Sequence, residues 1–168
     1  MSFKAEIKAS LGWIWSDGAT DNQRLDFARQ LLDGNGDDEA EAVWHLEDQT
    51  LLDGASTTLD LTSLTRTVLG DLHTVTLLAV KALLIVSQDA SSGDLLVGGA
   101  AADAWSEPFA AVGDRIAVPP DSPWLMANTQ AGWPVDSGNK NLKLAADGGD
   151  VVYSIAVLGT TTAPGSGS

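Results

Sequence analysis

The chain has 168 residues, 44% of them hydrophobic, and this length and composition suit one domain with a sizeable core. It carries 23 acidic residues against 9 Lys and Arg, a net charge of −14, which argues against binding nucleic acid or anionic membranes, because both need clustered bases. The lack of cysteine excludes disulfides and thiolate chemistry. Since neither a signal peptide nor an apolar run long enough for a membrane-spanning helix is visible, we expect a soluble protein.

The N-terminal segment has the clearest local pattern. Residues 3–15 alternate between apolar and polar side chains, and this period of two predicts a strand with one buried face. The positions on that face are Phe3, Ala5, Ile7, Ala9, Leu11, Trp13 and Trp15.

Residues 24–32 fit two kinds of secondary structure. The spacing of their apolar side chains matches one face of a strand, and it also matches one face of a helix. We favour the strand, because the segments on both sides are expected to be strands. The strand positions are Leu25, Phe27 and Leu31, and the helical positions are Leu25, Ala28 and Leu32.

The next segments are shorter. Residues 33–41 form a polar loop by composition, and residues 42–51 follow as a strand with Trp44 on its apolar side. A short strand is expected at residues 57–61. Residues 61–72 fit a helical turn.

Residues 74–87 form the longest apolar run, and both faces of the strand they predict are apolar. A strand of this kind is covered on both sides. It is therefore either central, beneath other elements, or it packs one face on a second subunit.

Short apolar segments rich in β-branched and aromatic residues continue to residue 159, cut at regular intervals by Gly, Pro, Asp and Asn. This pattern predicts an all-β fold, an antiparallel β-sandwich of jelly-roll-like type with at most one short helix. We expect one domain over residues 1–159, with residues 1–40 as an extended N-terminal arm or hairpin. Residues 160–168 have the composition of a flexible tail.

No catalytic constellation is visible in the sequence. His45 and His73 fall on different elements without metal-binding spacing, and no serine has the context of a nucleophile elbow. We therefore expect a protein that is not an enzyme and that needs no cofactor.

One polar loop carries a partial metal motif. Asp33, Asn35 and Asp37 occupy alternate positions, as the first ligands of a calcium loop do. The match then fails, because Asp38 stands where such a loop has Gly and Trp44 stands where it has a bidentate Glu. A solvated loop is the alternative to a calcium site.

The six tryptophans divide into two groups. Trp13, Trp15 and Trp44 fall on strands, and we expect at least two of them in the core. The other three lie near turns and prolines, where a Trp can anchor an interface, stack on a sugar, or pack at the end of the sandwich. The candidate interface residues are Trp105, Phe109, Trp124, Leu125 and Trp133.

Over residues 40–159 the succession of motifs resembles a group of small structural proteins of tailed bacteriophages. The departure comes after Pro119, where Pro120-Asp121-Ser122 replaces the Pro-Gly-Gly of the pattern. The shared motifs are structural turns, so they indicate fold more than role. They are Leu59-Asp60-Leu61, Lys81-Ala82-Leu83, Val97-Gly98-Gly99-Ala100, Pro119-Pro120, and Tyr153-Ser154-Ile155 leading to Gly159.

The resemblance implies a virion protein, made in the host cytoplasm and located on the capsid surface. Its expected role is decoration or cement: binding the major capsid protein outside the head, as a homotrimer, and clamping neighbouring capsomers. Residues 1–60, with 13 acids and 4 bases, are the segment expected to reach a neighbour. The alternative is a tail, fibre or spike module that binds host glycans through Trp105, Trp124 or Trp133.

Overall fold

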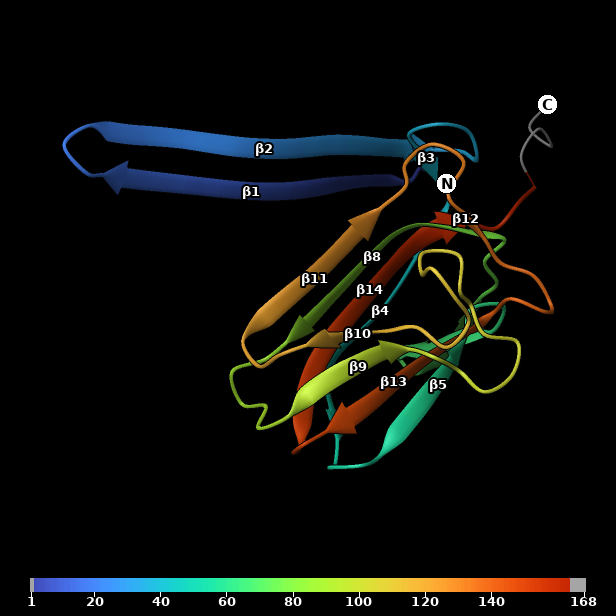
Figure 1. Cartoon of the computed structure of the whole chain (residues 1–168). Helices are drawn as coiled ribbons and strands as arrows, with labels where there is room; N and C mark the ends of the chain where they lie inside the picture. Colours follow the sequence, from blue (N-terminus) through green and yellow to red (C-terminus); the bar gives the residue numbers. More distant parts are fainter. Residues whose placement is uncertain (1, 164–168) are drawn as a thin grey trace.

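The computed structural model describes residues 2–163, which form a β-sandwich with a long projecting hairpin and, within this range, no helix (Figure 1). The all-β prediction is therefore confirmed. One layer of the sandwich has the strand order β10-β9-β13-β5, and the other has the order β11-β8-β14-β4 with β12 paired to β8. The bounds are β4 Ala42–Leu51, β5 Ser56–Asp60, β8 Ala79–Ser87, β9 Asp94–Gly98, β10 Arg115–Val118, β11 Ser122–Ala127, β12 Trp133–Pro134, β13 Asn141–Asp147 and β14 Val151–Thr160.

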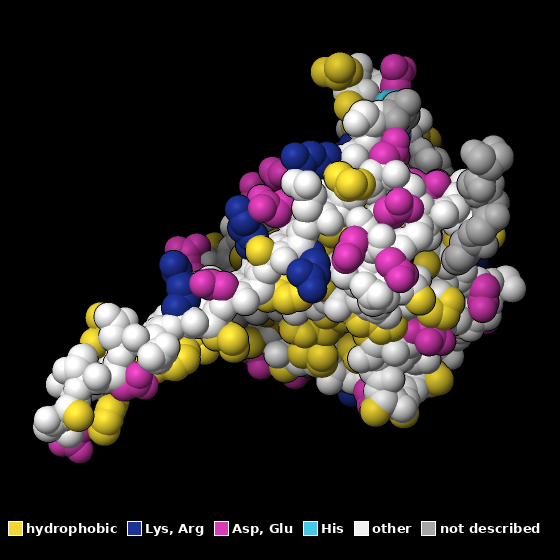
Figure 2. Space-filling view, turned by 90° about the horizontal axis from the view of Figure 1, so that it is seen from above, with side chains coloured by type: hydrophobic (Ala, Val, Ile, Leu, Met, Phe, Trp, Pro, Cys, Tyr) yellow, Lys and Arg dark blue, Asp and Glu magenta, His cyan; other side chains and the backbone are white. Residues whose placement is uncertain are grey.

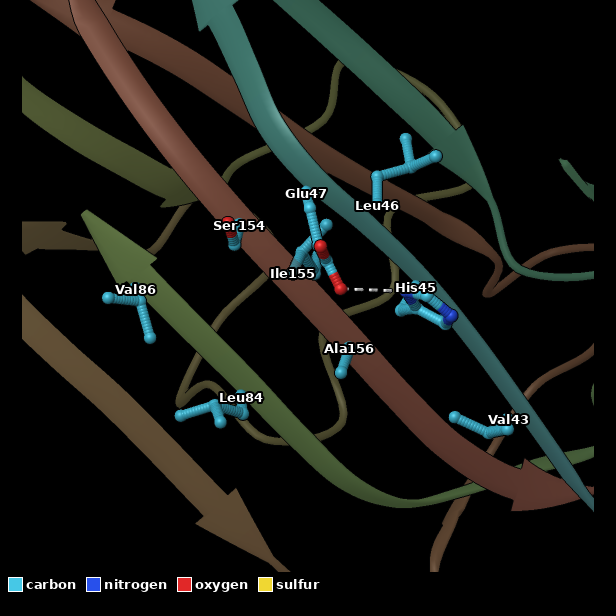
Figure 3. A pocket seen from close by; sticks show the side chains of 9 residues that line it. All are labelled: Val43, His45, Leu46, Glu47, Leu84, Val86, Ser154, Ile155 and Ala156. Carbon is cyan, nitrogen blue, oxygen red and sulfur yellow. Dashed lines mark ion pairs between the residues drawn. The ribbon is translucent and has the colours of Figure 1, made fainter. Parts of the chain in front are cut away.

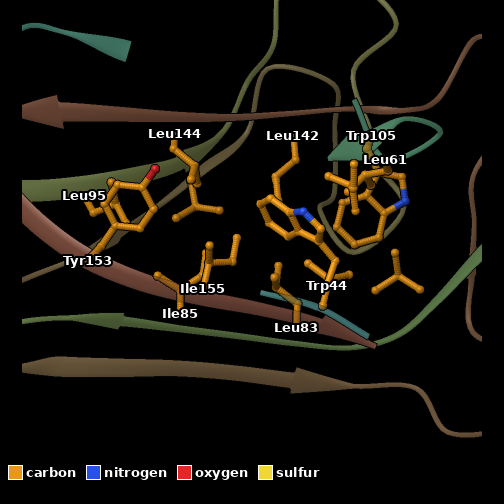
Figure 4. Close-up of a cluster of buried hydrophobic side chains, with 14 of the residues drawn as sticks. Trp44, Leu61, Leu83, Ile85, Leu95, Trp105, Leu142, Leu144, Tyr153 and Ile155 are labelled. Carbon is orange, nitrogen blue, oxygen red and sulfur yellow. The ribbon is translucent and has the colours of Figure 1, made fainter. Parts of the chain in front are cut away.

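The core fills the space between the two sheets (Figure 4). Side chains alternate in and out along each strand, so Leu142 and Leu144 of β13 face Leu83 and Ile85 of β8, and all four are fully buried. The indole N–H of Trp44 lies in this core and donates to the Thr65 carbonyl at 3.0 Å, which satisfies the one polar atom of that side chain.

A long hairpin precedes the sandwich and projects from it (Figure 1). It consists of β1 (Lys4–Ser16) and β2 (Thr20–Asp33), which pair antiparallel over their full length, and β3 (Glu39–Ala40) pairs with the end of β2. The strand favoured for residues 24–32 is thus confirmed, and the helical alternative is wrong.

The buried face predicted for residues 3–15 is correct only at the base of the hairpin. Ile7 is buried, but Trp13 is 41% exposed and Trp15 is 58% exposed. Of the three strand tryptophans, only Trp44 belongs to the core, so the prediction that at least two are core is wrong. Alternation decides which side chains share a face, but it does not decide what lies against that face.

Two further predictions fail between residues 61 and 78. The segment expected to hold a helical turn forms a hairpin, β6 (Leu64–Val68) and β7 (Asp71–Val75). The strand predicted from residue 74 starts instead at Ala79. The chain breaks there because Leu77 turns into the core and its N–H donates to the Leu61 carbonyl at 3.0 Å.

Two other predicted boundaries differ from the structure by only a few residues. β3 lies within the predicted polar loop, and Thr160, expected to begin the tail, is the buried last residue of β14. The rest of the predicted tail from residue 164 onward lies outside the described residues. Between residues 2 and 163, no helix is long and apolar enough to cross a membrane.

The β6–β7 turn yields the first prediction. Leu69 and Gly70 form a two-residue connection with φ of 52° and 95°, the left-handed pair of a type I′ turn, in which Asn-Gly is favoured. The Leu69 side chain is fully exposed and has no packing to lose. Leu69→Asn should therefore stabilise the protein by about 1 kcal/mol and raise Tm by about 2–4 °C in thermal unfolding.

The matched control is Leu72→Asn. Leu72 is also exposed, but it lies within β7, where Asn has low strand propensity, so this variant should not raise Tm. A fall in Tm for Leu69→Asn would contradict the assigned turn.

Candidate interaction surface

The outer face of the sheet containing β8 is apolar. Ala82, Leu84 and Val86 of β8 point away from the core, and strand register places Leu125 of β11 and Ala156 of β14 on either side of Leu84. Leu158 and Val43 extend this surface across β14 and β4. We call these seven residues the outer face: Val43, Ala82, Leu84, Val86, Leu125, Ala156 and Leu158.

The opposite sheet has a different exterior. Its outward positions, set by the pairing of β13 with β5 and β9, are mainly polar, and they include Thr58, Asp60, Asp94, Asn141 and Lys143. A solvated sandwich usually carries polar residues on both exteriors. The apolar outer face is therefore specific to one side of this molecule.

Two shallow depressions lie on the outer face. The first, of about 400 Å³, is bordered by Val43, Leu84, Val86 and Ala156 (Figure 3). Its polar lining residues are His45, Glu47 and Ser154, and the His45 Nδ1 lies 3.7 Å from the Glu47 carboxylate. The second, of about 410 Å³, also has Leu84 and Ala156 on its wall. It runs between the outer face and the base of the hairpin, where Ala5 and Ile7 form the other wall.

The hairpin has one mainly apolar side, which also carries Asp21, Gln23 and Arg29, and one mainly charged side. Register pairs Leu11 with Leu25 and Ala9 with Phe27, so the odd-numbered apolar residues of both strands share one face. At the base this face is buried, since Ile7 and Leu31 pack with Ala40 and Ala82. Farther out it is open, and we call these residues the apolar stripe: Leu11 (66% exposed), Trp13, Trp15, Leu25 (69%) and Phe27 (44%).

The other side of the hairpin is polar over most of its length. Lys8 and Glu6 form an ion pair at 2.9 Å, and Arg24 and Asp26 form another at 3.3 Å. Ile14, 75% exposed, is the apolar exception near the tip. Figure 2 shows the division: hydrophobic side chains follow one edge of the projecting arm and continue onto the body, while most of the charged side chains lie along the other edge and a few acidic ones lie at the tip.

A buried lysine fixes the loop that follows the hairpin. Lys81 of β8 is 1% exposed, and its ammonium donates to the Gly36 carbonyl at 2.9 Å and to the Gln130 carbonyl. Burial lowers the pKa of Lys81, while Asp37, Asp38 and Glu39 oppose that shift through their charges. Lys81 therefore ties residues 36–39 to the body beneath the hairpin.

A carboxylate fixes the same region to the end of β14. Glu41 accepts hydrogen bonds from the backbone N–H groups of Thr161 at 2.6 Å and Thr162 at 2.8 Å, and from both threonine hydroxyls. Burial raises the pKa of Glu41, but these hydrogen bonds outweigh it and hold the pKa below 4.5. Asn35 adds a bond from its amide to the Thr162 hydroxyl at 2.8 Å.

The residues of the partial calcium motif have different neighbours in the structure. The Asn35 amide is directed to Thr162 and to the Ala163 carbonyl, at 2.8 and 3.0 Å. Asp33 ends β2, and Asp37 lies among the acids near Lys81. Within residues 2–163, no group of three or more His, Cys, Asp or Glu side chains is placed to hold a metal ion.

The aromatic residues suggested as an interface lie mostly within the sandwich. Trp105 is 2% exposed, and its ring packs edge-on against that of Trp133, with the ring centroids 6.4 Å apart. Its indole N–H donates a hydrogen bond to the Pro134 carbonyl at 3.1 Å. Phe109 and Trp124 are half-buried with ring centroids 6.1 Å apart. Leu125, the remaining one of the five, lies on the outer face beside Ile7.

The residues of the apolar stripe were not recognised from sequence as a surface. Their alternation was visible, but it indicated a core strand, because most amphipathic strands lie on a core. The available signal was length: β1 and β2 have 13 and 14 residues, whereas no later strand has more than 10.

Comparisons with known proteins identify no family. No family model matches the chain, and no curated protein matches it. Among solved structures, the capsid asymmetric unit of cyanophage Pam1 is similar, with a TM-score of 0.26 and 20% sequence identity over 67% of this chain and 85% of that chain. A TM-score this low does not indicate a shared fold.

The Glu41 contacts predict a pH-dependent difference in stability. Because the pKa of Glu41 is lowered by folding, its carboxylate stabilises the fold above its ordinary pKa of 4.5, and that contribution is lost as the pH falls through the lowered value. Glu41→Gln should therefore melt below the wild type at neutral pH, and the gap in Tm should narrow under acid conditions.

Thermal unfolding at a series of pH values on both sides of 4.5 measures this gap. Glu47→Gln is the control, since the Glu47 side chain is 75% exposed and its replacement should leave Tm nearly unchanged at every pH. A gap for Glu41→Gln that stays constant with pH would contradict the assigned role.

Proposed function

We propose that this protein is a non-enzymatic structural protein of a tailed-phage virion. In this proposal it binds the outside of the head as a decoration or cement protein, contacts the major capsid protein, and stabilises contacts between capsomers. The observation that carries the proposal is the pair of adjoining apolar surfaces, the stripe and the outer face. Soluble monomers rarely leave such a large contiguous apolar area open, and those that do use it for contact.

Two other features support the proposal. The motifs of residues 40–159 resemble small phage structural proteins, as described above. The hairpin reaches outward from the sandwich. A shell would offer many equivalent places for such contacts. Because each contact is repeated around the shell, individually weak binding is enough to stabilise it.

The glycan-binding alternative has less support. It depends on tryptophans near turns, but Trp105 is buried, and Trp124 and Trp133 are half-buried against the core. A sugar platform needs an exposed ring face. The tail or fibre alternative therefore serves as a contrasting outcome in the test below.

Cosedimentation with expanded heads that lack this protein tests the proposal. We expect saturable binding, and we expect decorated heads to disrupt at a higher temperature than bare ones. Trp124→Ala and Trp133→Ala, provided that they fold, should bind heads as the wild type does, whereas a glycan-binding role would require these rings. Failure to bind heads, or binding to purified tails instead, would reject the decoration role.

A further inference from the structure

We infer that the apolar stripe of one chain docks on the outer face of a second copy of the same chain. The inference goes beyond the proposed function and does not depend on it, because it concerns the purified protein alone. It rests on how the two surfaces meet inside one chain, on charge, and on area.

The two surfaces already fit each other at the base of the hairpin. There Ile7 and Leu31, the inner continuation of the stripe, pack with Ala82 of the outer face, and Leu125 and Leu158 complete the contact. The hairpin then runs on beyond the body, as both overall views show, so the distal stripe leaves its own sheet behind (Figures 1 and 2). The same kind of contact can continue only on another molecule.

Charge favours the hairpin as the segment that approaches another copy. Residues 1–33 contain five acids and four bases, a net charge of −1, whereas residues 34–168 contain 18 acids and five bases, a net charge of −13. Two bodies of the same negative sign repel each other, but a nearly neutral arm can cross that field. The carboxylates that border the two depressions of the outer face are Glu47, 3.7 Å from His45, and Glu6, which forms an ion pair with Lys8.

The areas are sufficient for a stable assembly. The exposed fractions of the five stripe residues, 41–69%, correspond to about 500 Å² when each side chain offers about 150–250 Å². The outer face exposes less than the stripe, because Ala82 is buried and Leu84, its most open member, is 37% exposed. A single docking contact therefore buries less than about 1,000 Å², and reciprocal docking between two chains, at somewhat under about 2,000 Å², reaches the range of specific interfaces. The strand from Ala9 to Trp15 spans roughly 20 Å, which β8 can accommodate.

Charge-swap complementation tests the inference. One variant carries Leu11→Lys and Leu25→Lys, a cross-strand pair of the stripe, and the other carries Leu84→Asp at the centre of the outer face. Sedimentation equilibrium should give at least twice 17.4 kDa for the wild type and 17.4 kDa for each variant alone. Mixing the two variants should restore the larger mass, because an intact stripe then meets an intact face and Lys meets Asp.

The controls place the same changes elsewhere. Ile14→Lys lies on the other side of the hairpin, and Leu96→Asp lies on the exterior of the opposite sheet, so both should keep the wild-type mass. Circular dichroism and Tm establish folding. If a charged variant fails to fold, Leu11→Thr with Leu25→Thr replaces the Lys variant and Leu84→Thr replaces the Asp variant, with the same expected loss of mass.

Several results would overturn the inference. They are a wild type of 17.4 kDa at micromolar concentration, charge variants that keep the larger mass, controls that dissociate as the variants do, or a mixture that stays monomeric. A wild type that is monomeric but still binds heads would assign both apolar surfaces to the capsid. A wild type that assembles but ignores heads would keep the inference and remove the proposed function.

Discussion

The register of the β1–β2 hairpin determines which side chains the projecting arm presents on its mainly apolar side. Because Leu11 faces Leu25 and Ala9 faces Phe27, the apolar side chains of two long strands gather on one side. A slip of one residue in either strand would divide them between both sides. A two-stranded ribbon is at best marginally stable alone in water, so this one gains from a surface laid against its apolar side. Its own sandwich supplies that surface only at the base.

The contacts at the base hold the ribbon at a fixed place on the body. The Lys81 ammonium donates a hydrogen bond to the Gly36 carbonyl. The Glu41 carboxylate accepts hydrogen bonds from the backbone N–H groups of Thr161 and Thr162, directly after β14 ends. These bonds connect the segment between β2 and β4 to the two central strands, β8 and β14, which pair with each other. The base of the arm is thus anchored to the central strands of this sheet.

Sequence patterns predicted the sandwich because its strands alternate as sandwich strands must. β14 has Val151, Tyr153, Ile155 and Val157 inside, and residues 42–51 were placed with the same bounds as β4. The β6–β7 hairpin was missed because its turn is Leu-Gly rather than Asn-Gly. The interaction surface was missed for a different reason: a period of two identifies an apolar side equally well whether that side meets a core, a partner or water.

The central claim is that the stripe and the outer face are covered together in the working protein. Hydroxyl-radical footprinting of the assembled wild type, read by mass spectrometry, measures this directly. The claim predicts strong protection of Trp13, Trp15, Leu25 and Leu84, while Ile14 and Leu69, which are equally apolar and at least 75% exposed, are labelled freely. Labelling of Trp15 and Leu84 at rates that match their exposure in the single chain would contradict it.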